Sequence, residues 1–263
     1  MWICRWRAQG GKSKAYFGRT LDERYVIKSI SATERDSFLR HLAPNYLKYI
    51  DDAIDAGRDI CLAKILGMFQ VSLKSRIQDW EHTVIIMENV FYDRTCIRKY
   101  NLKGSKRGRI NPDAERRYAR GEEAIFLDND LRHHNKQAPP LLVDQHNLNC
   151  LQDALNRDTK FLADLGIMDY SLILGLDKER TEIVVGIINF AREYTLDKRF
   201  ETLIKSSGIL GGWGSEPTII SPNAYRTRFV EEILQYFTVV PTHDDWAAGT
   251  LGRGAEAAVR GSS

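Results

Sequence analysis

Apolar residues in the first third of the chain recur at the spacing of short β-strands. Tyr25–Ile30 is a run of strand-forming residues behind a turn at Asp22-Glu23, and residues 15–17 precede that turn. This arrangement predicts a β-hairpin. Residues 66–73 and 83–87 are two further apolar runs of strand length, separated by a polar segment. Together these runs predict a small antiparallel sheet.

One helix is expected beside this sheet. Apolar side chains between Phe38 and Ile50 follow helical spacing, behind the capping residues 31–33 and with Pro44 as an interruption. Residues 87–90 close the last strand and are expected to connect to a second lobe.

The second half of the chain predicts helices and a hairpin. Apolar residues recur at helical spacing in residues 149–165 and again in residues 225–237. Residues 168–174 and 182–190 predict two strands around a polar turn. Residues 106–123 are strongly charged and are interpreted as a surface loop.

These elements predict an α+β fold of two lobes, with antiparallel sheets and packed helices. The boundaries that we expect are an N-terminal lobe at residues 1–90, a C-terminal lobe at residues 91–246 and a disordered tail at residues 247–263. The tail alternates Gly, Ala and Ser, with too little apolar content to pack.

The composition is ordinary for a globular protein and excludes few classes of function. The chain has 263 residues, 43% hydrophobic and 28% charged, with a net charge of +3, too small to imply nucleic acid by itself. The apolar runs fall short of the roughly 20 residues that span a bilayer, so any membrane contact is expected to be peripheral. Cysteine spacing does not suggest a zinc or redox site and favours a reducing compartment; the four are Cys4, Cys61, Cys96 and Cys150.

Two features of the N-terminal part suggest phosphate chemistry. Gly10-Gly11-Lys12-Ser13 is a glycine pair whose backbone N–H groups are free to approach phosphate oxygens, followed by a charge and a hydroxyl. Lys28 lies in the apolar strand that follows. Taken alone, the first is more often an ordinary turn and the second an edge-strand lysine.

Six segments in this order resemble the phosphatidylinositol phosphate kinases, and most closely the phosphatidylinositol 3-phosphate 5-kinases of the PIKfyve type. The resemblance runs from about Ala8 to Trp246 and includes the two-lobed fold of that family, related to SAICAR synthase. The segments that carry it are Gly10-Gly11-Lys12-Ser13, residues 63–67, Met87-Glu88-Asn89, Leu102-Lys103-Gly104-Ser105, Met168-Asp169-Tyr170-Ser171-Leu172 and residues 205–212. The resemblance also implies further strands ahead of the glycine-rich loop, so the N-terminal lobe is expected to be incomplete.

The resemblance implies an ATP site between the lobes. Lys28 would reach the nucleotide phosphates, beside the glycine-rich loop. The connector would contact adenine, and two isoleucines would form the floor of the pocket, although both would be core residues in any interpretation. The implied ATP-binding residues are Gly10, Gly11, Lys12, Ser13, Lys28, Glu88, Asn89, Val90, Ile173 and Ile188.

The resemblance also implies catalytic roles for Asp169, Lys103 and Lys28. Asp169 would orient the inositol hydroxyl and take its proton, and Lys103 would act as a point charge in phosphoryl transfer. Asn189 occupies the position where the family has an aspartate that chelates Mg²⁺, and Asn101 replaces a second family aspartate. An amide oxygen brings no negative charge, so metal binding is expected to weaken.

The implied activity is transfer of the ATP γ-phosphate to the inositol 5-hydroxyl of phosphatidylinositol 3-phosphate, with ATP and Mg²⁺ as cofactors. Peripheral contact with endosomal or vacuolar membranes and a complex with scaffold and phosphatase subunits are implied as well. A specificity loop would select the lipid; its residues are Lys205, Ser206, Ser207, Gly208, Arg226 and Arg228.

Two other functions stay open. The amides at Asn189 and Asn101 also suit a nucleotide-binding scaffold with impaired catalysis. The basic cluster, defined as Lys106, Arg107, Arg109, Arg116, Arg117 and Arg120, suits either an anionic membrane surface or a solvated loop. A nucleic-acid module built on this cluster would need interleaved aromatic residues, and only Tyr118 is there.

Overall fold

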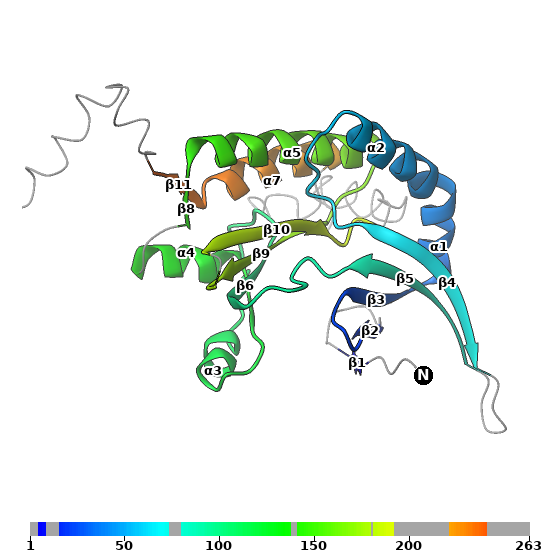
Figure 1. Cartoon of the computed structure of the whole chain (residues 1–263), viewed down its shortest axis with the longest axis horizontal. Coiled ribbons are helices and arrows are strands. Elements are labelled where there is room, and N and C mark those ends of the chain that lie inside the picture. The colour runs from blue at the N-terminus through cyan, green and yellow to red at the C-terminus, as the bar shows by residue number, and fades with distance from the viewer. Residues whose placement is uncertain are drawn as a thin grey trace, which may run out of the picture.

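The computed structural model of the chain describes residues 5–8, 16–73, 80–137, 141–179, 181–191 and 221–240. These residues form an α+β fold with two larger sheets, and the three longest helices lie along one side of them, whereas the short helix at residues 114–119 lies on the other (Figure 1). Among the described residues, no helix combines the length and apolar content needed to cross a bilayer. The proposed lobe boundaries stay a prediction, and the expected tail at residues 247–263 lies outside the described part.

The first sheet has the strand order β1-β2-β3-β5-β4. It comprises β1 (Arg5–Ala8), β2 (Tyr16–Arg19), β3 (Tyr25–Ile30), β4 (Ile65–Leu73) and β5 (Trp80–Glu88). The predicted hairpin is confirmed, with Lys28 of β3 opposite Phe17 of β2. β5 begins earlier than predicted because it pairs with β4 as far as Trp80.

The predicted helix is present but has three parts, α1 (Ala32–Ser37), the π-helical turn η1 (Phe38–Leu42) and α2 (Ala43–Asp55). Ser31 caps α1, and its side chain exchanges hydrogen bonds with Glu34. Pro44 lies in the first turn of α2, directly after the π-helical turn η1, so the α-helical pattern is interrupted next to it, as predicted.

The second sheet has the strand order β10-β9-β6-β7. Its strands are β6 (Cys96–Leu102), β7 (Ile125–Phe126), β9 (Ser171–Asp177) and β10 (Glu182–Ile188). The predicted hairpin is confirmed as β9 and β10, but both strands are shorter than expected. Asp169 and Asn189 therefore lie just outside the strands, each with a positive φ.

Further elements surround this sheet. They are α3 (Ala114–Ala119), α4 (Asp128–Gln137), β8 (Leu141–Val143), α5 (Gln145–Asp164), α7 (Pro222–Leu234) and β11 (Phe237–Val239). The prediction that residues 106–123 form a surface loop is wrong for Ala114–Ala119, which form α3. The last predicted helix ends at Leu234, because the residues after it form β11 and pair with β8.

The two sheets are joined at a short segment next to β10. Leu62 forms a parallel bridge with Ile187, and the Ala63 N–H donates to the Ile187 carbonyl at 2.9 Å. Buried Asp158 of α5 fixes this segment: it accepts hydrogen bonds from the backbone N–H groups of Cys61 at 2.6 Å and Leu62 at 3.0 Å, and from Tyr49 of α2 at 2.5 Å. One carboxylate thus ties the two sheets and two helices together.

Candidate functional site

Strand register gathers the predicted catalytic residues at one end of the second sheet. Leu102 of β6 lies opposite Leu172 of β9, and Ile188 of β10 lies opposite Ser171. The residues that follow β6 and β10, and those that precede β9, must therefore emerge together. They include Lys103, Asp169 and Asn189.

Lys103 and Asp169 form an ion pair there, with Nζ and Oδ1 2.5 Å apart. The Asp169 side chain is 59% exposed, so its remaining oxygen lone pairs are open to solvent or to a substrate hydroxyl. Its backbone lies in the left-handed region, with φ of 69°, and the Tyr170 that follows is fully buried. A paired, exposed carboxylate of this kind can accept a proton.

Lys28 approaches the same end of the second sheet from the first one. Its Nζ lies 3.4 Å from Oδ1 of Asn189, which connects β3 to the residue after β10. Lys28 also lies over the ring of Phe17, 5.6 Å from its centroid. The structure therefore brings together Lys28 and Asn189, two residues that the sequence places far apart.

The residues expected to contact adenine lie next to the β9–β10 hairpin. Ile173 pairs with Gly186, where an added Cβ would lie only 2.7 Å from Val90 Cγ2. Val90 thus packs directly on β10, on the face that also carries Ile173 and Ile188. This face is half-buried, whereas Leu172 and Leu174 of the opposite face are fully buried. A partly open apolar face suits a planar ring.

Glu88 and Asn89, the polar residues of the connector, are already bonded within the protein. Glu88 Oε1 accepts from the Lys64 N–H at 2.8 Å, and its carboxylate pairs with the Lys64 ammonium. The Asn89 side chain donates to the Glu23 carbonyl at 2.7 Å. Their side chains therefore hold the connector in place, and its contact with a nucleotide stays a prediction.

Asp128, which the sequence did not indicate, holds the turn that carries Lys103. Its carboxylate is fully buried and accepts from the backbone N–H groups of Lys103 at 3.0 Å and Ser105 at 3.2 Å. Arg109 Nε at 2.6 Å and the Tyr236 hydroxyl at 3.2 Å complete its partners. The sequence gives no recognisable sign of this role, because Arg109 and Tyr236 are distant in sequence from Asp128 and from the turn that carries Lys103 and Ser105. Asp128 is a positioning residue for Lys103.

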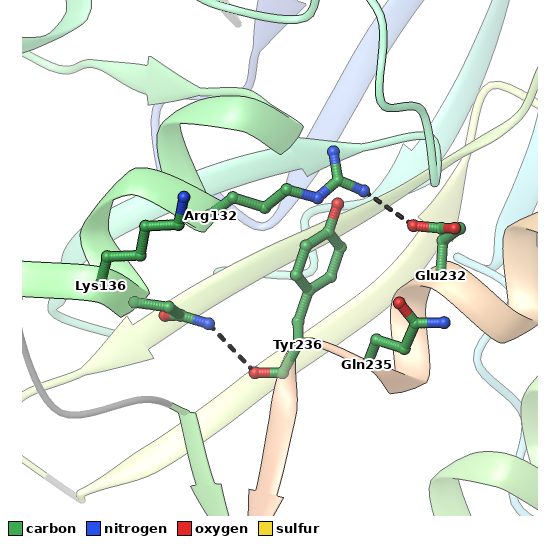
Figure 2. A pocket seen from close by; sticks show the side chains of 6 residues that line it. Arg132, Lys136, Glu232, Gln235 and Tyr236 are labelled. Atoms are coloured by element: carbon green, nitrogen blue, oxygen red, sulfur yellow. Dashed lines mark hydrogen bonds and ion pairs between the residues drawn. The ribbon is translucent and has the colours of Figure 1, made fainter.

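A polar hollow of about 240 Å³ lies behind this turn (Figure 2). Arg132 pairs there with Glu232 at 2.9 Å, donates to the Ser105 carbonyl at 2.8 Å and lies over the Tyr236 ring. Figure 2 shows these side chains directed toward one another. The hollow therefore supports the Lys103 turn through Arg132, and Lys136 is a second cation that lines it.

Helix α7 packs against the same turn. Gly104 has φ of 60°, and an added Cβ would lie 3.1 Å from the Phe229 Cα atom. The Tyr225 hydroxyl donates to the Tyr170 carbonyl at 2.5 Å. Burial raises the pKa of Tyr225 well above its usual range, and the negative charge of Asp169 acts in the same direction. Tyr225 therefore remains a neutral donor that fixes the residue after Asp169.

Arg226 and Arg228 were expected in a specificity loop, but both lie on α7. The helix forms there because Ser221 caps it and Pro222 occupies its first turn. The Arg226 guanidinium reaches the Asn156 side chain of α5 at 3.4 Å, whereas Arg228 lies over the Tyr225 ring. The other predicted site residues, Gly10, Gly11, Lys12, Ser13, Lys205, Ser206, Ser207 and Gly208, lie outside the described residues.

Most of the basic cluster is paired with nearby carboxylates. Arg109 pairs with Asp128, Lys106 with Glu232 at 2.8 Å, and Arg116 with Asp113. Arg117 and Arg120 both lie within ion-pair distance of Glu122. These partners reduce the positive potential that an anionic membrane would meet, and they favour the solvated interpretation of this segment.

The described residues do not supply a carboxylate site for Mg²⁺. No group of three or more His, Cys, Asp or Glu side chains with metal-binding spacing occurs among them. The Asn189 amide oxygen is bonded to the Lys28 ammonium, and the Asn101 amide oxygen accepts from Arg109 Nη2 at 3.0 Å. Both oxygens are neutral and face a cation already, so this donor set does not fit a protein-held magnesium ion.

Comparison with known proteins now identifies the family. The family model described as phosphatidylinositol-4-phosphate 5-kinase matches residues 3–183. The chain is 43% identical over 252 residues to a 1-phosphatidylinositol-3-phosphate 5-kinase of Arabidopsis thaliana, covering 94% of this chain and 14% of that protein. It is 39% identical over 241 residues to the human 1-phosphatidylinositol 3-phosphate 5-kinase, covering 90% of this chain and 11% of that protein. The relative from Saccharomyces cerevisiae is 36% identical over 247 residues, covering 92% of this chain and 10% of its own length.

The chain thus spans about a seventh or less of the length of these relatives. The matched residues include β3 with Lys28, the Lys103 turn, Asp128 and Asp169. The chain belongs to the phosphatidylinositol-4-phosphate 5-kinase family.

Proposed function

We propose that this chain is a lipid kinase domain that transfers the γ-phosphoryl group of ATP to the inositol 5-hydroxyl of phosphatidylinositol 3-phosphate. The observation that carries the proposal is the Lys103–Asp169 pair at the sheet end that Lys28 also approaches. The substrate is proposed from relatives whose names state that activity.

The arrangement of the side chains suggests how they would act. Lys28 would bind the phosphates of ATP. Its adenine ring would pack against Val90, Ile173 and Ile188. The inositol hydroxyl would hydrogen-bond to Asp169, lose its proton to that carboxylate and attack the γ-phosphorus, while the bond to the bridging oxygen breaks and ADP leaves. Lys103 would hold Asp169 in place through their ion pair and would offset the negative charge that develops on the transferred group.

The lipid is presented at a membrane, so peripheral contact with an endosomal or vacuolar surface is part of the proposal. Scaffold and phosphatase subunits are proposed as partners of the longer protein.

A second candidate function is nucleotide binding with weakened catalysis, as in a scaffold. One observation favours it: Asn189 and Asn101 place neutral amides beside Lys28 and Arg109, where a kinase site needs negative charge to hold Mg²⁺.

The test is lipid phosphorylation on vesicles that contain phosphatidylinositol 3-phosphate, with ATP binding measured on the same samples. We expect product from the parent chain and a loss of about 10²–10⁴-fold in Asp169→Asn, the usual contribution of a general base. Asp164→Asn, at an exposed carboxylate of α5, is the matched control and should behave as the parent does. Equal activity of the two variants would remove Asp169 from the reaction. ATP binding without product would favour the second candidate.

A further inference from the structure

The outer face of α2 carries the two most exposed large apolar side chains in the described part of the chain. Ile54 is 67% exposed and Leu47 is 64% exposed. They are two helical turns apart in sequence, so they lie on the same face of the helix. Ala43 and Ile50, both half-buried, fall at the intervening turns. The spacing of residues 43, 47, 50 and 54 is that of a helix seam that packs against a second helix.

This stripe faces away from the contacts that hold α2 in the fold. Tyr49 stacks on Phe161 of α5, with ring centroids 4.3 Å apart, and the hydroxyl of buried Tyr46 accepts from the Ile65 N–H at 2.9 Å. Leu47 is two residues before Tyr49, about 200° around the helix, and therefore points to the opposite side. α2 also lies at one end of the layer of helices (Figure 1). Leu47 and Ile54 thus contribute little to the fold.

Two carboxylates flank the stripe. Asp51 lies one turn after Leu47 and one turn before Ile54, and Asp55 lies one turn after Asp51. Neither carboxylate has a hydrogen-bond or ion-pair partner among the described residues, whereas Asp52 pairs with Lys48 at 2.8 Å. Carboxylates four residues apart on a helix repel each other, and at its C-terminal end they also oppose the helix dipole. The last turn of α2 has no basic residue to offset them.

The nearest described arginines along this helix are engaged elsewhere. The Arg58 side chain donates to the Asp52 carbonyl at 2.8 Å and its backbone N–H donates to the Ala53 carbonyl at 2.9 Å, so it caps the helix end. Arg40 lies 3.7 Å from Asp36, one turn earlier. The outer face of α2 therefore combines exposed apolar side chains with uncompensated negative charge, and neither feature stabilises this domain.

We propose that this face of α2 binds an amphipathic helix of a partner protein. The apolar stripe of that helix would pack on Leu47 and Ile54, and its Lys or Arg side chains would pair with Asp51 and Asp55. Burial of apolar surface drives such an association, and the flanking charges set the choice of partner. An anionic membrane surface attracts basic segments and repels these carboxylates, so the occupant is a protein helix and not a lipid surface.

The probe for this interaction is a fluorescent helical peptide with Leu at the two core positions of each heptad and Lys at the flanking positions. A peptide with Glu in place of Lys is its control. Fluorescence anisotropy measures the Kd of each peptide for the whole chain. We expect the Lys peptide to bind at least about tenfold more tightly than the Glu peptide, because only the Lys peptide complements Asp51 and Asp55.

Substitutions in the stripe test the apolar contact. The double variant Leu47→Gln, Ile54→Gln should bind the Lys peptide roughly 100-fold more weakly, since each buried anchor contributes about tenfold. Leu21→Gln is the matched control, because Leu21 is 62% exposed in the turn between β2 and β3. It should bind as the parent does.

Substitutions at the carboxylates test the charges independently. The double variant Asp51→Asn, Asp55→Asn should bind the Lys peptide about two- to tenfold more weakly at low salt, the size expected of two exposed ion pairs. The difference should disappear at high salt, where such pairs are screened. The double variant Asp153→Asn, Asp164→Asn removes two exposed carboxylates of α5 and should bind as the parent does.

Thermal unfolding without peptide verifies that every variant is folded. Failure of the Lys peptide to bind the folded parent would contradict the proposal, and so would equal binding of the two peptides. Losses in the α2 variants no larger than those in their controls would place the peptide elsewhere on the chain. A separate arm uses vesicles with anionic lipid: binding to the parent that is lost in the Leu47→Gln, Ile54→Gln variant would show that this face contacts a membrane, and the protein partner would be wrong.

Discussion

At the scale of single residues, Lys28 is the side chain that links the two sheets at the candidate site. We expect Lys28→Ala to weaken ATP binding by roughly 1.5–3 kcal/mol, because it removes a charge-assisted contact with phosphate. Lys178→Ala, in the exposed turn at the other end of the β9–β10 hairpin, is the matched control. Calorimetry on both variants measures the difference, and equal ATP affinities would exclude Lys28 from the site.

Asn189 gives a second prediction at this scale, on rate. If the missing charge limits turnover by about 3–4 kcal/mol, the chain is roughly 10²–10³-fold slower than it would be with a carboxylate. Asn189→Asp should then recover much of that rate, and adding Asp169→Asn to it should abolish activity. Lipid phosphorylation at matched Mg²⁺ compares the three proteins. A variant Asn189→Asp no faster than the parent would show that the charge at this position does not limit catalysis.

The site residues divide into those that sequence could indicate and those that it could not. Lys28, Lys103 and Asp169 lie in short segments that resemble a family, so the sequence alone indicates each of them. Asp128 was missed because its role depends on donors from Lys103, Ser105, Arg109 and Tyr236, which only the fold brings together.

At the scale of elements, the packing of α7 on the Lys103 turn depends on Gly104. Gly104→Ala combines a left-handed backbone with a contact to Phe229 of 3.1 Å, and should destabilise the fold by about 2–4 kcal/mol. Gly57→Ala is the control, because Gly57 has nearly the same φ but no atom within 4 Å of the added Cβ. It should cost about 1–2 kcal/mol. Urea denaturation measures the free energy of unfolding of both variants. Equal decreases would show that α7 shifts to accommodate the added methyl group without further cost.

The joint between the sheets gives a prediction on pH. Burial raises the pKa of Asp158 above its usual range, although the Tyr49, Cys61 and Leu62 donors act in the opposite direction. A raised pKa in the folded state means that folding favours the protonated form. The stabilising contribution of Asp158 is therefore complete below its unfolded pKa and is lost as the pH rises through its folded pKa.

Asp158→Asn does not titrate, so it isolates this contribution. We expect the free energy of unfolding of the parent, minus that of Asp158→Asn, to fall as the pH is raised from the ordinary aspartate range toward neutrality. Urea denaturation at several pH values measures this difference. A difference that rises with pH would show that the three donors dominate over burial.

Long periodic elements were predicted better than short ones. α5 is amphipathic along its length, with Leu155 and Leu162 fully buried, so its apolar period identified it. β7, β8 and β11 have two or three residues each and no period to detect. α3 was predicted as loop because its charged side chains lie mainly on the surface, where helix and loop have similar compositions.

At the scale of the whole molecule, the two sheets meet where all the proposed chemistry lies. The first sheet contributes Lys28, the second contributes Lys103 and Asp169, and the Leu62–Ile187 bridge fixes one sheet beside the other. α7 packs beside the second sheet. Its Arg228 lies over the ring of Tyr225, and the Tyr225 hydroxyl bonds to the carbonyl of Tyr170, the residue after Asp169. This arrangement puts a cation of α7 near the position proposed for the inositol ring.

The last prediction concerns the lipid that the molecule selects. We expect vesicles with phosphatidylinositol 3-phosphate to be bound in preference to vesicles with the 4-phosphate or 5-phosphate isomer, on the proposal that residues 205–229 form the segment that selects the lipid. Arg228→Gln should reduce that binding by roughly tenfold or more, since a hydrogen bond to a charged group contributes about 1.5–3 kcal/mol. Arg40→Gln is the control, because Arg40 is an exposed arginine of η1 that pairs with Asp36 outside the candidate site. Co-sedimentation with the three kinds of vesicle at matched surface charge measures both effects. Equal binding of all three isomers would contradict the preference, whereas equal losses in the two arginine variants would show that the loss follows the change of charge and not the position of Arg228.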